Sequence, residues 1–143
     1  MVFWKRKPLE LKYPLLIFVD RDSVCMGDDC ESHVCSSSWE GTAEVSQLLE
    51  WLIGYVPKMH DSVWAVCSDR GVLGYLVTDA DGNTAIEVKG PNRLLAAAGV
   101  QSVRCRYYHT RSFSRIDRET GEQIEKHAGC NTLLEKVKRE LEG

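Results

Sequence analysis

The sequence has no hydrophobic run long enough to cross a bilayer. Its longest apolar stretches are 15–19 and 94–100, the second of which includes Gly99, whereas a membrane-spanning helix needs about 20 apolar residues. The first residues are basic, and charge returns before any apolar stretch follows, so we expect no signal peptide. These absences predict a cytoplasmic protein with no membrane partner, and its six cysteines are then reduced thiols.

Common catalytic signatures are also missing. The chain contains no G-x-S-x-G nucleophile elbow, no G-x-x-x-x-G-K-[ST] or G-x-G-x-x-G phosphate loop and no H-E-x-x-H zinc motif. Internal repeats are absent, and the composition, 43% apolar and 27% charged, excludes a disordered or collagen-like chain. At 143 residues we expect a single globular domain over 1–143, with 1–13 as a basic N-terminal arm.

What the sequence does hold is an uneven distribution of charge. The net charge is only −3, yet residues 14–62 carry nine acidic and two basic side chains, a net charge of −7. Such a segment suits a basic partner or a hard cation and argues against a phosphate-binding surface there. The alternative is a solvated acidic face that only aids solubility.

Hydrophobic patterning predicts five strands. The apolar run 14–19 is typical of a strand buried on both faces. Residues 63–67 and 72–78 form a hairpin signal, and 84–89 follow a second turn. In 102–109, alternation puts valine, cysteine and tyrosine on one face and two arginines and a tyrosine on the other.

The remaining elements are mainly helices. Apolar spacing predicts an amphipathic helix over 45–56, with Gly41-Thr42 as its N-cap, and a short helix over 92–98. The C-terminal helix has a capping box, Thr132-x-x-Glu135. A short extended piece near 33–37 and a further strand over 112–117 complete an α+β fold: a mixed or mainly antiparallel sheet with two to three helices packed on one face.

A cluster of cysteines and one histidine offers an alternative to partner binding. Cys25, Cys30, His33 and Cys35 could ligate zinc, although their spacing contains no CxxC pair, and the acidic residues around them lack the EF-hand order. They leave open a metal- or thiol-dependent enzyme centred on residues 20–35. We expect no cofactor.

A nucleic-acid-binding module is the other alternative. The stretch Arg104–Arg115 contains basic and aromatic residues, which could contact phosphates and stack on bases, and the alternative is a strand with one solvated arginine face. Among the remaining thiols, Cys67 and Cys105 fit apolar strand patterns and are expected in the core. Cys130, three residues from His127, is a weak candidate for a Cys–His pair.

The segment from Arg21 to His33 carries a resemblance. Its motif D-S-V-x-x-G-D-D, here DSVCMGDD followed by a downstream histidine, resembles small bacterial proteins, among them immunity proteins of contact-dependent inhibition and other polymorphic toxin systems. The resemblance covers roughly residues 14–78, and this chain departs from it where small acidic residues are replaced by Cys30-Glu31-Ser32. It implies a cognate binding partner and no catalysis.

The leading hypothesis is therefore an immunity protein that binds and neutralises a cognate toxin domain with a basic surface, such as a nuclease. Acidic side chains would steer association and pair with arginine or lysine, while a tryptophan would provide the aromatic anchor. The predicted contact residues are Asp22, Asp28, Asp29, Glu31, Trp39 and Glu40.

Overall fold

The structure is a computed structural model that describes residues 14–25, 27–109 and 129–143, without the side chain of Asp29. Several sequence predictions fall outside the described residues. They are the basic arm over 1–13, the strand over 112–117, His127 and the end of the basic-aromatic stretch beyond 109. In chain order the elements are β1 (Leu15–Arg21), the 3-10 turn η1 (Gly27–Cys30), β2 (Cys35–Trp39), α2 (Val45–Tyr55), β3 (Ser62–Ser68), β4 (Gly71–Thr78), β5 (Thr84–Val88), α3 (Leu95–Ala98), β6 (Ser102–His109) and α4 (Cys130–Glu142).

The described strands form one six-stranded sheet in the order β2-β1-β6-β3-β4-β5. Among the described strands, only the β1–β6 pair is parallel, and the other neighbours are antiparallel. This mixed sheet with its helices confirms the predicted α+β fold. No described helix is long and apolar enough to span a bilayer.

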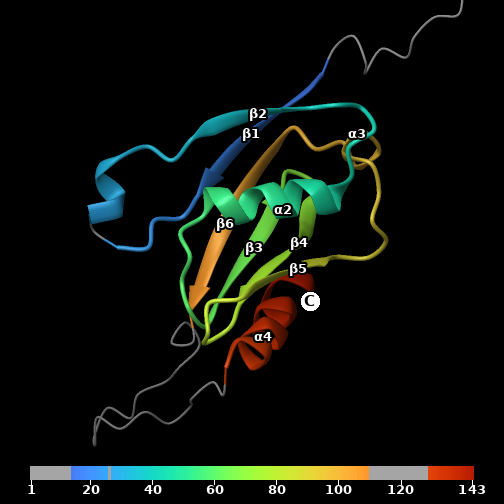
Figure 1. Cartoon of the computed structure of the whole chain (residues 1–143). Helices are drawn as coiled ribbons and strands as arrows, with labels where there is room; N and C mark the ends of the chain where they lie inside the picture. Colours follow the sequence, from blue (N-terminus) through green and yellow to red (C-terminus); the bar gives the residue numbers. More distant parts are fainter. Residues whose placement is uncertain (1–13, 26, 110–128) are drawn as a thin grey trace, which may run out of the picture.

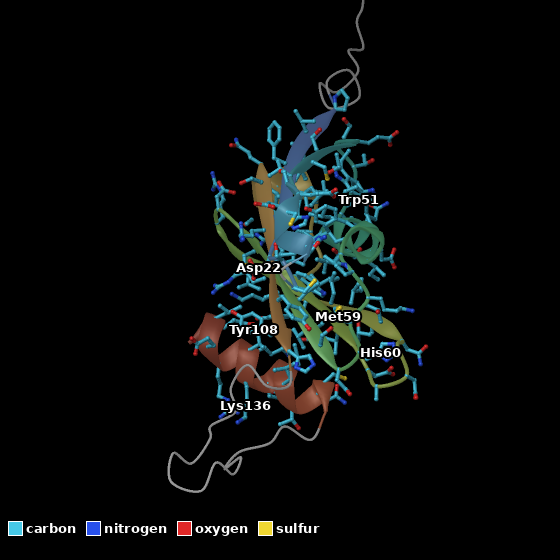
Figure 2. All side chains as sticks on the ribbon, turned by 90° about the vertical axis from the view of Figure 1, so that its left-hand side faces the viewer. Asp22, Trp51, Met59, His60, Tyr108 and Lys136 are labelled. Atoms are coloured by element: carbon cyan, nitrogen blue, oxygen red, sulfur yellow. The ribbon has the colours of Figure 1, made fainter. Side chains whose placement is uncertain are left out.

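The helices cover both faces of the sheet, so the expectation that they lie on one face is wrong. Figure 1 shows α2 in front of the strands, and the view turned by 90° in Figure 2 shows α4 on the opposite side. Leucines of α2 pack with Ile17, Val19 and Trp64 in the larger core, whereas Leu133 of α4 packs with Tyr75 in a smaller one. The smaller core lies over β3 and β4.

Strand β1 is buried on one face only, which corrects the prediction of two buried faces. Ile17 and Val19 are 0% and 1% exposed, while Leu16 and Phe18, which alternate with them, are 47% and 52% exposed. The reason is the position of α4, which packs against β3, β4 and β6 and does not reach β1. Among the described elements, none covers the Leu16–Phe18 side of β1 (Figure 2).

Two helix starts also differ from expectation. The N-cap of α2 is Glu44, whose backbone N–H donates to Oε1 of Gln47 at 2.8 Å. Asn92 supplies a further acceptor, because its Oδ1 binds the backbone N–H of Ser46 at 3.0 Å. Helix α4 begins at Cys130, so Thr132 lies inside its first turn and cannot cap it. At α2 a local capping box of Glu44 and Gln47 thus replaces the predicted cap, and Asn92 adds one contact from a distant segment.

Candidate partner-binding site

The motif that carries the resemblance folds into a hydrogen-bonded cluster after β1. The Asp28 carboxylate accepts two hydrogen bonds from the Arg21 guanidinium, at 2.6 and 2.9 Å, and one from the backbone N–H of Val24 at 3.0 Å. The Arg21 and Asp28 side chains are only 11% and 18% exposed. The bonds from Arg21 and then from Val24 hold the pKa of Asp28 well below its usual range. Asp28 therefore fixes the loop as an anion and is not presented to solvent.

His33 closes the same cluster. Its Nε2 lies 3.1 Å from Oγ of Ser23 and 3.6 Å from Oδ1 of Asp28, and its backbone carbonyl accepts a hydrogen bond from the Tyr55 hydroxyl of α2. The Asp28 carboxylate can only accept a hydrogen bond, so a proton on Nε2 of His33 suits its position beside Ser23 and Asp28. The direction of the Ser23–His33 hydrogen bond depends on which ring nitrogen carries the proton. The motif ties the loop to the strand and to α2.

A second ion-pair group links the end of β1 to β6. Arg104 donates to Oδ1 of Asp22 through Nε and Nη2, at 3.0 and 2.8 Å, and to Oδ2 of Asp20 through Nη1 at 3.0 Å. The other oxygen of Asp22 accepts the backbone N–H of Tyr107 at 3.0 Å. The hydrogen bond to Asp22 is the main reason that the pKa of Arg104 is raised. Asp22, labelled in Figure 2, thus holds two strands in register and has both oxygens engaged.

The acidic residues left available to a partner are fewer than the sequence suggested. Glu31 and Glu40 are exposed, and neither forms an ion pair within the described part of the chain. The side chain of Asp29 lies outside the description. Glu31 lines an open hollow of about 510 Å³, together with Asp20 and Asp22 and with the arginines that lie beside them, Arg21 and Arg104. We call it the acidic hollow.

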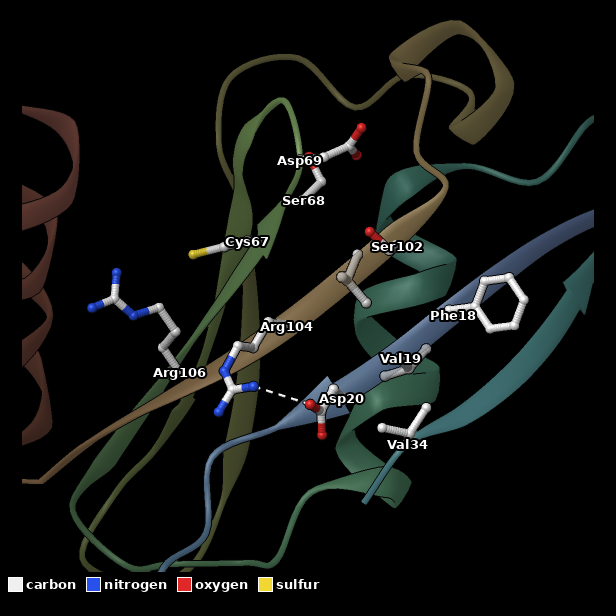
Figure 3. A pocket seen from close by; sticks show the side chains of 11 residues that line it. Phe18, Val19, Asp20, Val34, Cys67, Ser68, Asp69, Ser102, Arg104 and Arg106 are labelled. Carbon is white, nitrogen blue, oxygen red and sulfur yellow. Dashed lines mark hydrogen bonds and ion pairs between the residues drawn. The ribbon is translucent and has the colours of Figure 1, made fainter. Parts of the chain in front are cut away.

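An apolar pocket adjoins the acidic hollow. It has a volume of about 390 Å³ and is lined by Phe18 and Val34, with Arg104 and Arg106 at its polar side (Figure 3). Val34 is 60% exposed. Asp20, Val34 and Arg104 line both cavities, which makes them one continuous surface.

We call this surface the uncovered face. Residues opposite each other in adjacent strands share a face, and β2 contributes Ser36 and Ser38 opposite Phe18 and Leu16. Its described residues are Leu16, Phe18, Asp20, Val34, Ser36, Ser38, Ser102 and Arg104. It is apolar in the middle and charged along one margin.

Trp39 belongs to the opposite side of β2. It is half-buried, packs against the larger core, and donates from Nε1 to Oγ of Ser37 at 2.8 Å. Its ring meets the edge of Trp51 at a centroid distance of 6.2 Å, and Trp51 stacks on Tyr55 at 5.9 Å. Trp51 of α2, labelled in Figure 2, is 39% exposed. The predicted anchor is therefore not adjacent to the acidic hollow.

The thiol cluster does not converge. Cys25 and Cys30 are exposed, Cys35 packs against the larger core, and His33 is engaged as described above. Within the described ranges, no three histidine, cysteine or acidic side chains lie close enough together to hold a metal ion.

Strand β6 shows the predicted alternation of faces, but most of its basic and aromatic side chains contact other protein groups. Tyr107 packs against Trp64 at a centroid distance of 5.0 Å, and Arg106 lies over the ring of Tyr108 at 5.9 Å. Arg104 is paired with Asp22. The aromatic faces are therefore occupied by protein groups.

Comparison with protein-family models, curated proteins and solved structures finds no match for this chain. Sequence reasoning missed the exposure of Leu16 and Phe18. The run 15–19 is apolar throughout, so it gives no alternation to separate a buried face from an open one. The one available signal is the short apolar stripe of the C-terminal helix, which cannot cover a whole face of six strands.

Proposed function

We propose that this protein acts by binding another protein, as an immunity protein that occludes the active domain of a cognate bacterial toxin. The observation that carries the proposal is the uncovered face, where Leu16, Phe18 and Val34 are each about half exposed beside the acidic hollow. Apolar patches with a polar rim are typical of protein interfaces.

The charge beside this face favours a basic partner. Residues 14–62 have a net charge of −7, and Glu31 and Glu40 are exposed carboxylates within that segment. A nuclease has to bind phosphate and so has a basic active surface, which is the complement of this one. The resemblance of the D-S-V-x-x-G-D-D segment to immunity proteins points to the same class of partner.

The predicted contact residues divide into two roles under this proposal. Asp22 and Asp28 position the strand end and the loop through Arg104 and Arg21. Glu31 and Glu40 steer the partner, while Phe18 takes the anchoring role that the sequence suggested for Trp39.

The test uses the product of the gene adjacent to the one that encodes this chain. We expect direct binding, measured by calorimetry, and protection of cells that express the adjacent product. Phe18→Ser should weaken binding by about 30-fold, the effect of a hot-spot residue worth about 2 kcal/mol. Leu94→Ser is the matched control, because Leu94 is 42% exposed at the start of α3, away from the uncovered face. No binding by the unmodified protein would overturn the proposal.

Steering is tested separately by charge reversal. Glu31→Lys should slow association several-fold at low salt and flatten its dependence on ionic strength, with less effect on dissociation. An association rate equal to that of the unmodified protein at low salt would remove Glu31 from the interface.

A further inference from the structure

The two outer strands of the sheet are protected to different degrees. Exposed strand edges pair readily with other chains, and proteins usually guard them with charges, proline or covering elements. At one outer edge, α2 packs against β5, and Glu87 of β5 pairs with Lys138 of α4. At the other, β2 has the sequence Cys-Ser-Ser-Ser-Trp, with neither charge nor proline. Among the described strands, β2 pairs with β1 alone.

The backbone groups that β2 presents can be identified from its neighbour. The backbone N–H of Phe18 donates to the carbonyl of Gln101, just before β6, at 3.0 Å, and that of Asp22 donates to the carbonyl of Cys105 in β6 at 2.9 Å. Both groups therefore point toward β6. Backbone groups alternate between the two sides of a strand, so Ile17 faces β2 and bonds to its partner Ser37.

The same alternation fixes the groups on the free edge. Ser36 and Ser38 lie opposite Phe18 and Leu16, whose backbone groups point away from β2. The N–H and C=O of Ser36 and Ser38 therefore point outward, away from β1. Their small side chains lie on the uncovered face, so a strand added here would place every second side chain on the same face as the exposed Leu16 and Phe18, across the two serines.

We propose that the partner adds an extended strand to the β2 edge, hydrogen-bonded to the backbones of Ser36 and Ser38. This inference rests on the proposed function and specifies how the partner docks. The added strand has apolar side chains at alternate positions and a basic residue near an end, because the exposed carboxylates of Glu31 and Glu40 flank β2.

A second copy of this chain fits the edge less well. It would bring another acidic segment of net charge −7 against the first, including a second Glu31 and Glu40. Like charges placed across an interface oppose association. Charge complementarity thus favours a basic strand from a different protein.

The decisive variants are Ser36→Pro and Ser38→Pro, each matched by an alanine variant. Proline removes one outward N–H that β1 does not use and is tolerated on an edge strand when that group faces solvent. Alanine keeps the N–H. With the adjacent gene product as the probe, we expect each proline variant to bind at least 10-fold more weakly than its alanine counterpart.

Hydrogen exchange provides a readout that does not depend on the variants. The outward amides of Ser36 and Ser38 should exchange rapidly in the free protein and become protected in the complex, while the amide of Ser37 is protected in both. Circular dichroism checks that each proline variant remains folded.

The outcomes separate the two proposals. Equal binding by proline and alanine variants, or no added protection at Ser36 and Ser38, would overturn strand addition and leave the proposed function standing. If the unmodified protein does not bind the probe, both proposals fail. A dimer of this chain that Ser38→Pro dissociates would assign the edge to a second copy and overturn the proposed partner.

Discussion

Strands β3 and β4 lie between two helices, whereas the described part of the chain places a helix on only one face of β1 and β2. In the first half, Val63, Ala65 and Tyr75 are all fully buried beneath α4. In the second half, Leu16 and Phe18 occupy the same face of the sheet and are about half exposed. The comparison teaches that apolar residues of one face differ in burial: those under α4 form the smaller core, and those of β1 stay about half exposed.

The two halves also differ in their polar chemistry. Ion pairs gather at the end of β1, where Asp22 binds Arg104 and Asp28 binds Arg21. The covered half is held mainly by apolar contacts, with the Tyr75 hydroxyl bound to Glu142 near the end of α4. A half-covered strand that exposes apolar side chains is thus positioned by charged groups at its end.

Matched truncations give the largest expected difference between the halves. Leu133→Ala removes a side chain that is 0% exposed under α4 and should lower the free energy of unfolding by about 2–5 kcal/mol. Leu16→Ala removes a side chain that is 47% exposed and should lower it by less than about 1 kcal/mol. Urea unfolding measures both. Similar losses would mean that the face of β1 is covered in solution and would break the comparison.

The second prediction concerns the ion pairs of the half-covered side. Because the native pKa of Asp28 lies below its unfolded value of about 3.9, this residue stabilises the fold at neutral pH and loses that effect as the pH falls below about 4. Asp28→Asn should therefore lower stability at pH 7 and make the acid decline shallower. Urea unfolding from pH 7 to pH 3 tests this.

Asp69→Asn is the control for that experiment. Asp69 is exposed, and the described residues give it no ion pair. We expect it to change stability by less than about 0.5 kcal/mol at either pH. An acid decline in Asp28→Asn as steep as that of the unmodified protein would show that Asp28 does not couple the loop to folding.

The sequence predicts the positions of the helices and strands better than it predicts which of their faces are buried. Strand β6 is an instance in which alternation identified both faces correctly, since Val103 and Cys105 are buried and Arg104 is exposed. Strand β1 is the opposite case. Its run is apolar on both faces, and which face stays open depends on where α4 packs, a choice that no local pattern in 15–19 records.

The candidate site shows the same limit. The sequence marks the acidic residues but not their partners, because Arg104 stands 82 residues after Asp22 and meets it only through the parallel β1–β6 pairing. Arg21 directly precedes the motif, and its bond to Asp28 depends on the turn at η1. Such tertiary contacts decide which carboxylates of the acidic segment are paired within the protein. Asp28 is paired with Arg21, whereas Glu31 and Glu40 are exposed and form no ion pair within the described residues.

Thiol reactivity gives the smallest effect and the finest comparison of the two faces. Cys67 and Cys105 lie on adjacent strands but on opposite faces, Cys67 along the apolar pocket and Cys105 beneath α2. Burial raises the pKa of both thiols, that of Cys105 to about 12, and the thiolate is the reactive form. With iodoacetamide at pH 8 and mass spectrometry, the exposed Cys25 should be alkylated first, Cys67 later, and Cys105 only on unfolding. Partner binding should slow Cys67 further, because the proposed interface closes the pocket along which it lies. Equal labelling of Cys67 and Cys105 in the folded protein would show that the face next to β1 is as closed as the face beneath α2.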